Sequence, residues 1–206
     1  MAITDTFDLF TDSGLTTPFS GTLTLTHYTN LSDNPQDTTL YFGSTNSNRK
    51  VQADSNPGVD NMTLTPTDGI TDWSTATAYS VGDRVEPTTP NGYVYECTTA
   101  GTSHASTEPT WPTTGIGSST VNDGTAVWTL LSARHELTEI KLALTSGGLA
   151  GATAGAALNI GTVVNGGTGN AQEIHIRVTN AVTNVSDTTG YAEITLDTNT
   201  LLETIL

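Results

Sequence analysis

The sequence predicts an all-β protein. We expect an antiparallel β-sandwich, Ig-like or jelly-roll-like, with a small three-stranded aromatic-rich β module inserted in one of its loops. Two observations predict the sandwich: short segments alternate apolar and polar residues with a period of two, and threonine, asparagine and glycine are abundant. Threonine is β-branched and suits strands, whereas asparagine and glycine supply turn dihedrals. The placement of the aromatic residues predicts the inserted module.

Three segments before the module alternate as strands do, at residues 21–28, 38–44 and 61–66. Each has one apolar and one polar face, which is typical of a sandwich whose sheets have a dry side and a wet side. Their apolar positions are Leu23, Leu25, Leu40, Phe42, Met62 and Leu64.

Three further strands are predicted after the module, and residues 187–190 between the last two indicate a hairpin or a longer connection between sheets. Residues 147–161 are rich in glycine, which costs about 1 kcal/mol per residue in a helix interior, so a strand or loop is expected there. The apolar positions of these strands are Ile140, Leu142, Leu144, Ile174, Ile176, Val178, Ala192, Ile194 and Leu196.

The aromatic residues divide the chain into two parts. All three tryptophans and three of the six tyrosines lie within residues 69–131, whereas all four phenylalanines lie outside. Such a split indicates two hydrophobic cores. We therefore expect residues 1–68 and 132–206 to form one split sandwich, and residues 69–131, the module, to be inserted at a surface loop, where insertions are best tolerated.

Three turn signals organise the module. Asn91-Gly92 favours a tight hairpin turn before a strand that starts at Tyr93, because this dipeptide accepts positive φ values. Gly82-Asp83 bends the preceding strand, and Asp123-Gly124 leads into a third strand. Three short strands bury little apolar area, so large aromatic side chains must supply the core.

The module resembles the small chitin-binding type of carbohydrate-binding module, whose W…Y…GD.V…G..Y.C order it follows, with Trp111 near the usual third aromatic position. A further tryptophan in residues 122–129 (NDGTAVWT) makes it most similar to the copies found in tailed-bacteriophage virion proteins. The flanking Thr/Asn-rich segments also resemble phage structural proteins. The residues that carry the module pattern are Trp73, Tyr79, Gly82, Asp83, Val85, Gly92, Tyr95 and Cys97.

The resemblance implies a sugar-binding role through exposed aromatic rings, and two assignments of the rings follow. We expect Trp73, Tyr95 and Trp128 to form the module core, because they lie in alternating strand contexts. Tyr79, Tyr93 and Trp111 are the candidate glycan contacts. Tyr93 shares its parity with Tyr95 and the adjacent aromatic pair of chitinase modules is missing, so packing in the core is the alternative for these rings.

Composition excludes several classes of function. The formal net charge is −15, so a phosphate backbone is repelled and nucleic-acid binding is not expected. No segment approaches the roughly 18 apolar residues of a membrane span. The first residues lack the basic and apolar regions of a secretory signal, so we expect synthesis in a host cytoplasm. The single cysteine, Cys97, excludes an intramolecular disulfide.

No motif predicts catalysis, a cofactor or a metal. The histidines lack metal-ligand spacing, and residues 135–139 (HELTE) lack the second histidine of a zinc helix. Residues 33–37 (DNPQD) have no calcium-loop spacing, and His175 is expected on the polar face of a strand. No nucleophile elbow or phosphate loop is present, so we expect a protein that is not an enzyme.

These observations predict a non-enzymatic phage virion structural protein, most specifically a capsid decoration or cement protein on the particle exterior. Its expected partners are the major capsid protein or other virion proteins and copies of itself, since many weak contacts add through multivalency. The alternative is an adhesin module of the tail, neck or fibre that contacts host-surface glycans. The apolar residues 201–206 either complete the sandwich or add as a strand to a neighbouring subunit.

Overall fold

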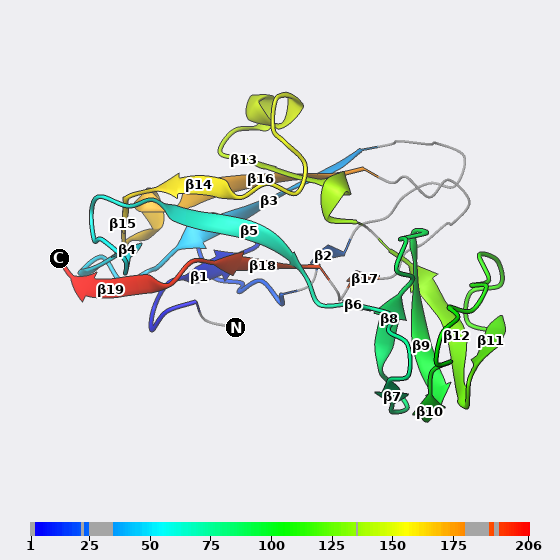
Figure 1. The fold of residues 1–206 in the computed structure, drawn as a ribbon. Coiled ribbons are helices and arrows are strands. Elements are labelled where there is room, and N and C mark those ends of the chain that lie inside the picture. Colours follow the sequence, from blue (N-terminus) through cyan, green and yellow to red (C-terminus); the bar gives the residue numbers. More distant parts are fainter. Residues whose placement is uncertain (1–2, 22, 25–34, 135, 180–189, 192–193) are drawn as a thin grey trace.

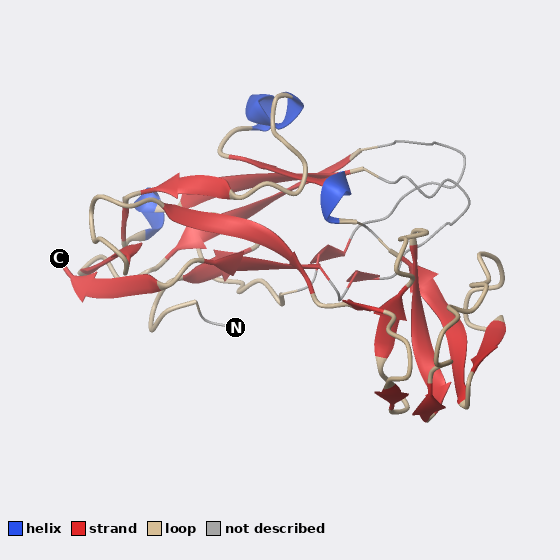
Figure 2. Ribbon diagram, viewed as in Figure 1, coloured by secondary structure: helices blue, strands red, loops and turns tan. Residues whose placement is uncertain are grey.

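The computed structural model describes residues 3–21, 23–24, 35–134, 136–179, 190–191 and 194–206. These residues form an all-β fold of several antiparallel sheets with three short 3-10 helices (Figure 2). The predicted all-β class with antiparallel sheets is therefore confirmed. None of the described helices is long and apolar enough to cross a membrane.

The first sheet of the sandwich has four antiparallel strands in the order β1-β3-β16-β13. Alternation places one face of β16 in the core, where Ile174, Ile176 and Val178 are buried, while His175 and Arg177 lie on the other face. The strands are β1 (Asp8–Phe10), β3 (Gln36–Gly43), β13 (Ile140–Ala143) and β16 (Gln172–Val178).

The opposite sheet consists of two three-stranded ladders, β14-β5-β18 and β15-β4-β19. The strands of the two ladders are consecutive in the chain, with β4 before β5, β14 before β15 and β18 before β19, so the two ladders form one bent sheet (Figure 1). The strands are β4 (Arg49–Ala53), β5 (Met62–Asp68), β14 (Leu158–Gly161), β15 (Val163–Asn165), β18 (Ile194–Thr198) and β19 (Leu201–Ile205).

Asn199 bridges the break between these ladders. Its Oδ1 accepts a hydrogen bond from Thr63 N at 2.9 Å, and its Nδ2 donates to Asn61 O at 3.2 Å. Beside it, Asp54 N donates to Thr200 O at 3.0 Å. Backbone groups that would lose ladder partners at the bend are thereby satisfied, as buried and half-buried polar groups generally require.

Two buried clusters of hydrophobic side chains stand on different parts of the chain. The sandwich cluster draws only on residues 7–64 and 140–196, and the second cluster only on residues 73–133. Figure 1 shows the second group of strands beyond one end of the sandwich, joined to it through β5 and through the segment after β12. Independent folding of the two parts remains a prediction.

Several predicted sandwich details need correction. Leu144 is 40% exposed rather than buried, because β13 ends at Ala143. Part of the glycine-rich segment is helical: η2 (Ser146–Ala150) is a 3-10 helix capped by Thr145, whose Oγ1 accepts from Gly148 N at 3.1 Å. The other short helices are η1 (Leu137–Glu139) and η3 (Thr168–Asn170).

Outside the module, the remaining described strands are β2 (Leu23–Thr24) and β17 (Gly190–Tyr191), which pair with each other. Leu25, Ala192 and residues 187–189 lie outside the described residues. Since β16 and β18 belong to different sheets, the chain between them runs from sheet to sheet and forms no hairpin of those two strands.

The module contains more strands than the three predicted. Its main sheet has five strands in the order β11-β12-β9-β8-β6, and β10 and β7 form a separate pair. Strand β6 pairs with β8 in parallel, and the last strand runs to Ala133, so the module is taken below as residues 69–133. Its strands are β6 (Thr71–Asp72), β7 (Ala78–Tyr79), β8 (Arg84–Glu86), β9 (Tyr93–Thr99), β10 (Gly101–Thr102), β11 (Thr120–Asp123) and β12 (Ala126–Ala133).

Candidate functional site

The aromatic core of the module is organised around a buried carboxylate, Asp123, at the end of β11. Asp123 is 2% exposed, and its Oδ2 accepts hydrogen bonds from Trp73 Nε1 at 2.7 Å and Trp128 Nε1 at 3.0 Å. Its Oδ1 accepts from His104 N at 2.7 Å. Three donors therefore compensate one buried charge, and hydrogen bonds of this charged kind are stronger than neutral ones.

The turn after Asp123 holds the carboxylate in this position. Gly124 has φ +59°, and a Cβ atom there would lie 2.3 Å from Thr102 O. Thr125 N donates to the same carbonyl oxygen at 2.9 Å. The β11–β12 turn thus packs closely against the end of β10 and the residues after it. Glycine is required at position 124 because φ is positive there and because a Cβ atom has no space.

Trp111 has a carboxylate partner of its own in the long loop between β10 and β11. Trp111 Nε1 donates to Glu108 Oε1 at 2.8 Å, and the same oxygen accepts from Thr88 N at 2.9 Å. Burial acts to raise the pKa of Glu108, but the hydrogen bonds from Thr88 and Trp111 outweigh it and lower the pKa below its usual value. The loop is thereby closed over the core.

The aromatic rings pack on one another. The Trp111 ring lies 4.4 Å from the Tyr95 ring and 5.9 Å from the Trp128 ring, measured between centroids. Tyr79 meets Trp128 edge to face at 4.7 Å. Pairs at these distances and angles stabilise a core beyond the area that they bury.

Tyr95 anchors the loop that precedes its own strand. Its buried hydroxyl donates to Pro112 O at 2.9 Å and accepts from Asn91 Nδ2 at 2.8 Å. Burial raises the pKa of Tyr95 to about 12, partly opposed by the Asn91 hydrogen bond. The predicted tight turn is wrong: Asn91-Gly92 ends the longer loop between β8 and β9, two strands that pair through Val85 and Tyr95.

The predicted site residues occupy different environments. Trp73, Tyr95 and Trp128, expected in the core, are 4%, 0% and 0% exposed. Of the three candidate glycan contacts, Tyr93 is also buried, so its expected exposure is wrong: the alternation that it shares with Tyr95 carries both rings inward. The remaining two are half-buried against the same cluster. The candidates therefore form no exposed row of rings.

An open groove of about 480 Å³ lies where the chain enters the module. Tyr79 is the aromatic side chain in its lining, and its hydroxyl accepts from Ser74 N at 2.9 Å. Arg84 also lines the groove, with its Nε 3.2 Å from Glu96 Oε2. The rest of the lining is residues 69–71, Ala78, Gly82 and Asp83.

A buried ion pair lies where the chain leaves the module. Arg134, 1% exposed, pairs with Glu86, and its Nη2 lies 3.9 Å from Glu136 Oε2. Burial and the neighbouring carboxylates of Glu136 and Asp72 raise the pKa of Glu86, while the Arg134 guanidinium favours the charged carboxylate. Removing one member of such a pair is expected to be costly, because the other charge is left buried.

The remaining reactive groups are explained by packing. Cys97 is buried, its Sγ donates to Thr99 O at 3.1 Å, and burial raises the pKa of its thiol. His175 lies on β16 beside Glu173 and Thr39, on the polar face as expected. Within the described residues no three His, Cys, Asp or Glu side chains are grouped to hold a metal ion. His27, His135 and Asp33 lie outside those residues.

Comparison with known proteins found no matching family model, no matching curated protein and no matching solved structure.

Proposed function

We propose that this chain is a non-enzymatic structural protein of a tailed-phage virion, made in the host cytoplasm and displayed on the capsid exterior as a decoration or cement protein. Its partners are the major capsid protein or other virion proteins, together with copies of itself. The resemblance of residues 73–128 to the modules of phage virion proteins supports the phage assignment. The geometry of the module supports decoration over sugar binding.

The observation that carries this choice is the use of the indole groups. The indole N–H groups of Trp73, Trp111 and Trp128 all donate to carboxylates of the chain itself, Asp123 or Glu108. The rings of Trp111 and Trp128 also pack against tyrosines of the same core. A sugar-binding platform needs free ring faces, so the module is better suited to be a stable outward protrusion.

The polar faces of the strands fit exposure in a crowded assembly. On the outer face of the bent sheet, Thr67 Oγ1 lies 2.7 Å from Thr195 Oγ1 and donates to Asp197 Oδ2 at 2.6 Å. Hydroxyl groups and a net charge of −15 keep such a surface from associating without specificity.

An adhesin that contacts host-surface glycans is the second candidate. One observation favours it: Tyr79 is half-buried and borders the groove at the start of the module, beside the charged side chains Asp83 and Arg84. An aromatic ring flanked by polar groups in a groove is a common arrangement for small ligands.

Heads of the phage that encodes the chain, assembled with its coding sequence deleted, provide the test. We expect the purified protein to co-sediment with these heads to saturation and to raise their resistance to heat. Binding to intact host cells without binding to heads would replace decoration by adhesion. In that case Tyr79→Ala should abolish cell binding, whereas Tyr41→Ala, on a sandwich strand, should leave it unchanged. Binding to neither would remove both functions.

A further inference from the structure

Strand β19 leaves one edge of the bent sheet open. It pairs with β4 on one side only, with Leu202 opposite Gln52 and Thr204 opposite Lys50. Leu206 N donates to Asn48 O, and Asp54 N donates to Thr200 O, so the even-numbered residues bond to β4. Because antiparallel ladders alternate, the N–H and C=O groups of Leu201, Glu203 and Ile205 point away from β4, and none pairs with another described backbone group.

The sheet edges at β1, β13, β14 and β15 are covered, irregular or short within the described residues. Residues 17–19 cover β1, where Phe19 N donates to Leu9 O at 2.8 Å. On β13, Ile140 O accepts a hydrogen bond from Gly155 N at 2.8 Å. Strand β14 is irregular at Gly161, and β15 is only three residues long. Bulges, short strands and covering loops are the usual protections of an edge. Among the described residues no backbone group bonds to the outward side of β19, and residues 4–6 hydrogen-bond to this strand only through the Glu203 side chain.

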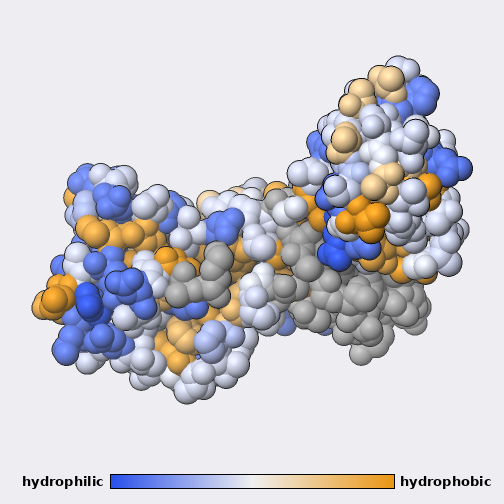
Figure 3. All heavy atoms as spheres, turned by 90° about the horizontal axis from the view of Figure 1, so that it is seen from below, coloured by the Kyte–Doolittle hydropathy of each residue, from blue (hydrophilic) through white to orange (hydrophobic). Residues whose placement is uncertain are grey.

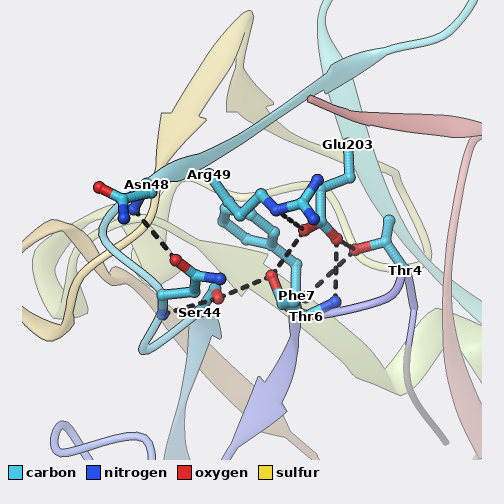
Figure 4. A network of polar contacts seen from close by, with 8 residues as sticks. Thr4, Thr6, Phe7, Ser44, Asn48, Arg49 and Glu203 are labelled. Carbon is cyan, nitrogen blue, oxygen red and sulfur yellow. Dashed lines mark hydrogen bonds and ion pairs between the residues drawn. The ribbon is translucent and has the colours of Figure 1, made fainter. Parts of the chain in front are cut away.

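The carboxylate that could protect β19 is turned inward. Glu203 Oε2 accepts from Thr4 Oγ1 at 2.7 Å and from Thr6 N at 2.9 Å, while Oε1 accepts from Thr6 Oγ1 at 2.7 Å (Figure 4). Oε1 also lies 3.7 Å from Arg49 Nε. The Glu203 side chain is only 5% exposed, so its charge is compensated within the chain and repels an approaching strand little.

Charge opposes self-association less at this place than over the rest of the chain, whose formal net charge is −15. The chain has only six Lys and Arg residues against 21 Asp and Glu, and two of the six, Arg49 and Lys50, lie on β4 directly beside β19. At the end of β19, Ile205 is 71% and Leu206 61% exposed. Figure 3 shows apolar atoms at this tip among hydrophilic ones.

We propose that β19 pairs with β19 of a second copy of this chain, antiparallel and about a two-fold axis at Glu203. This register uses all three outward-facing residues on both strands: Leu201 lies opposite Ile205 of the other copy, and Ile205 opposite its Leu201. The two apolar pairs are self-complementary, as a two-fold interface requires. The β15-β4-β19 ladders of the two copies then form one continuous sheet of six strands across the dimer.

This pairing stands on β19 alone and does not depend on the virion role. A chain that dimerises but does not bind phage heads would keep the pairing and remove the proposed function. A chain that binds heads but stays monomeric would remove the pairing and keep the proposed function.

The first test is analytical ultracentrifugation of the full chain over a range of concentrations. We expect the mass to approach twice 21.5 kDa as concentration rises. Ile205→Pro removes an outward N–H without removing a bond to β4, a position where an edge strand tolerates proline, and should abolish the dimer. Val163→Pro is the matched control, since Val163 N–H faces the open edge of β15 on the opposite side of the same sheet. It should leave the dimer intact.

The second test fixes the register by disulfide formation. With the axis at Glu203, residue 202 of one copy lies opposite residue 204 of the other in a pair without hydrogen bonds, where Cα atoms are about 4.5 Å apart. A Leu202→Cys chain mixed with a Thr204→Cys chain should therefore crosslink, and each variant alone should crosslink far less. Cys97 is fully buried and should not interfere.

Three results would overturn the pairing. They are a chain that stays monomeric at every concentration, a dimer that survives Ile205→Pro while Val163→Pro abolishes it, and crosslinks that form equally well with either cysteine variant alone. A monomer whose binding to heads is lost in Ile205→Pro would assign the edge to a capsid segment, which also contradicts self-pairing.

Discussion

Asp123 and Trp73 are 50 residues apart in sequence, and their side chains meet at 2.7 Å in the centre of the module. The same carboxylate oxygen holds Trp128. One buried carboxylate therefore ties the segment that follows β6 to the β11–β12 hairpin, and the aromatic core depends on it.

Asp123→Asn should destabilise the module strongly. An amide keeps one acceptor oxygen and gains two donors, so it faces three donors with a poorer set of acceptors. Loss of hydrogen bonds to a charged group in a buried site predicts a decrease of about 2–4 kcal/mol in the free energy of unfolding. Differential scanning calorimetry measures it. Asp54→Asn, on the exposed surface, is the control, and equal small losses in both variants would contradict the prediction.

Gly124→Ala should cost more than the same change at Gly117. Both glycines have positive φ, +59° and +75°, so both substitutions carry similar backbone strain, on the order of 1–2 kcal/mol. At Gly124 the added methyl group also meets Thr102 O, whereas at Gly117 nothing lies within 4 Å. The difference in unfolding free energy between the two variants measures the cost of the contact with Thr102 O. Similar values would show that the turn shifts to accommodate the methyl group.

The sandwich should lose stability in acid through Glu203. Burial acts to raise the pKa of Glu203, but hydrogen bonds from Thr4 and Thr6 and the charge of Arg49 lower it below the ordinary value of 4.5. A lowered pKa contributes stability that is present above the ordinary value and is lost as pH falls through the folded-state pKa. Urea unfolding followed by far-UV circular dichroism between about pH 3 and pH 7 should show this loss.

Glu203→Gln should flatten the acid dependence and lower the stability at neutral pH. Glu173→Gln serves as the control, because that side chain is 55% exposed. An unchanged pH profile in Glu203→Gln would exclude the carboxylate network as its cause.

Excision of residues 69–133, with a few glycines bridging the cut, should leave the sandwich folded. Its buried cluster contains no residue from the module, so removal of the module takes nothing from that core. We expect a strand-type circular dichroism spectrum and a cooperative thermal transition. An unfolded product would show that the two parts fold as one unit.

Alternation predicted the longer strands well, because a face that is buried repeats every second residue. Ile174, Ile176 and Val178 on β16 were found from this pattern alone, and so were Met62 and Leu64 on β5. Strands that do not alternate escaped prediction, such as β4 (Arg49–Ala53), in which three consecutive residues are buried.

The polar interior of the module could not be predicted. Asp123 reads in the sequence as a turn residue before Gly124, and its burial depends on indoles from two other segments. Glu108 is similar, since its partners Thr88 and Trp111 are brought together only by the closed loop. For Tyr93 the signal was present: its shared parity with Tyr95 indicated the buried position that it takes.

The confinement of every tryptophan to residues 69–133 gives the module an optical signal of its own. Light absorbed at the long-wavelength edge of the indole band reports only on the module, because the rest of the chain contains phenylalanine and tyrosine but no tryptophan. Each indole also rests beside a carboxylate, so its emission should shift as soon as that contact opens. Fluorescence of the isolated chain can therefore follow residues 69–133 alone, without any added label.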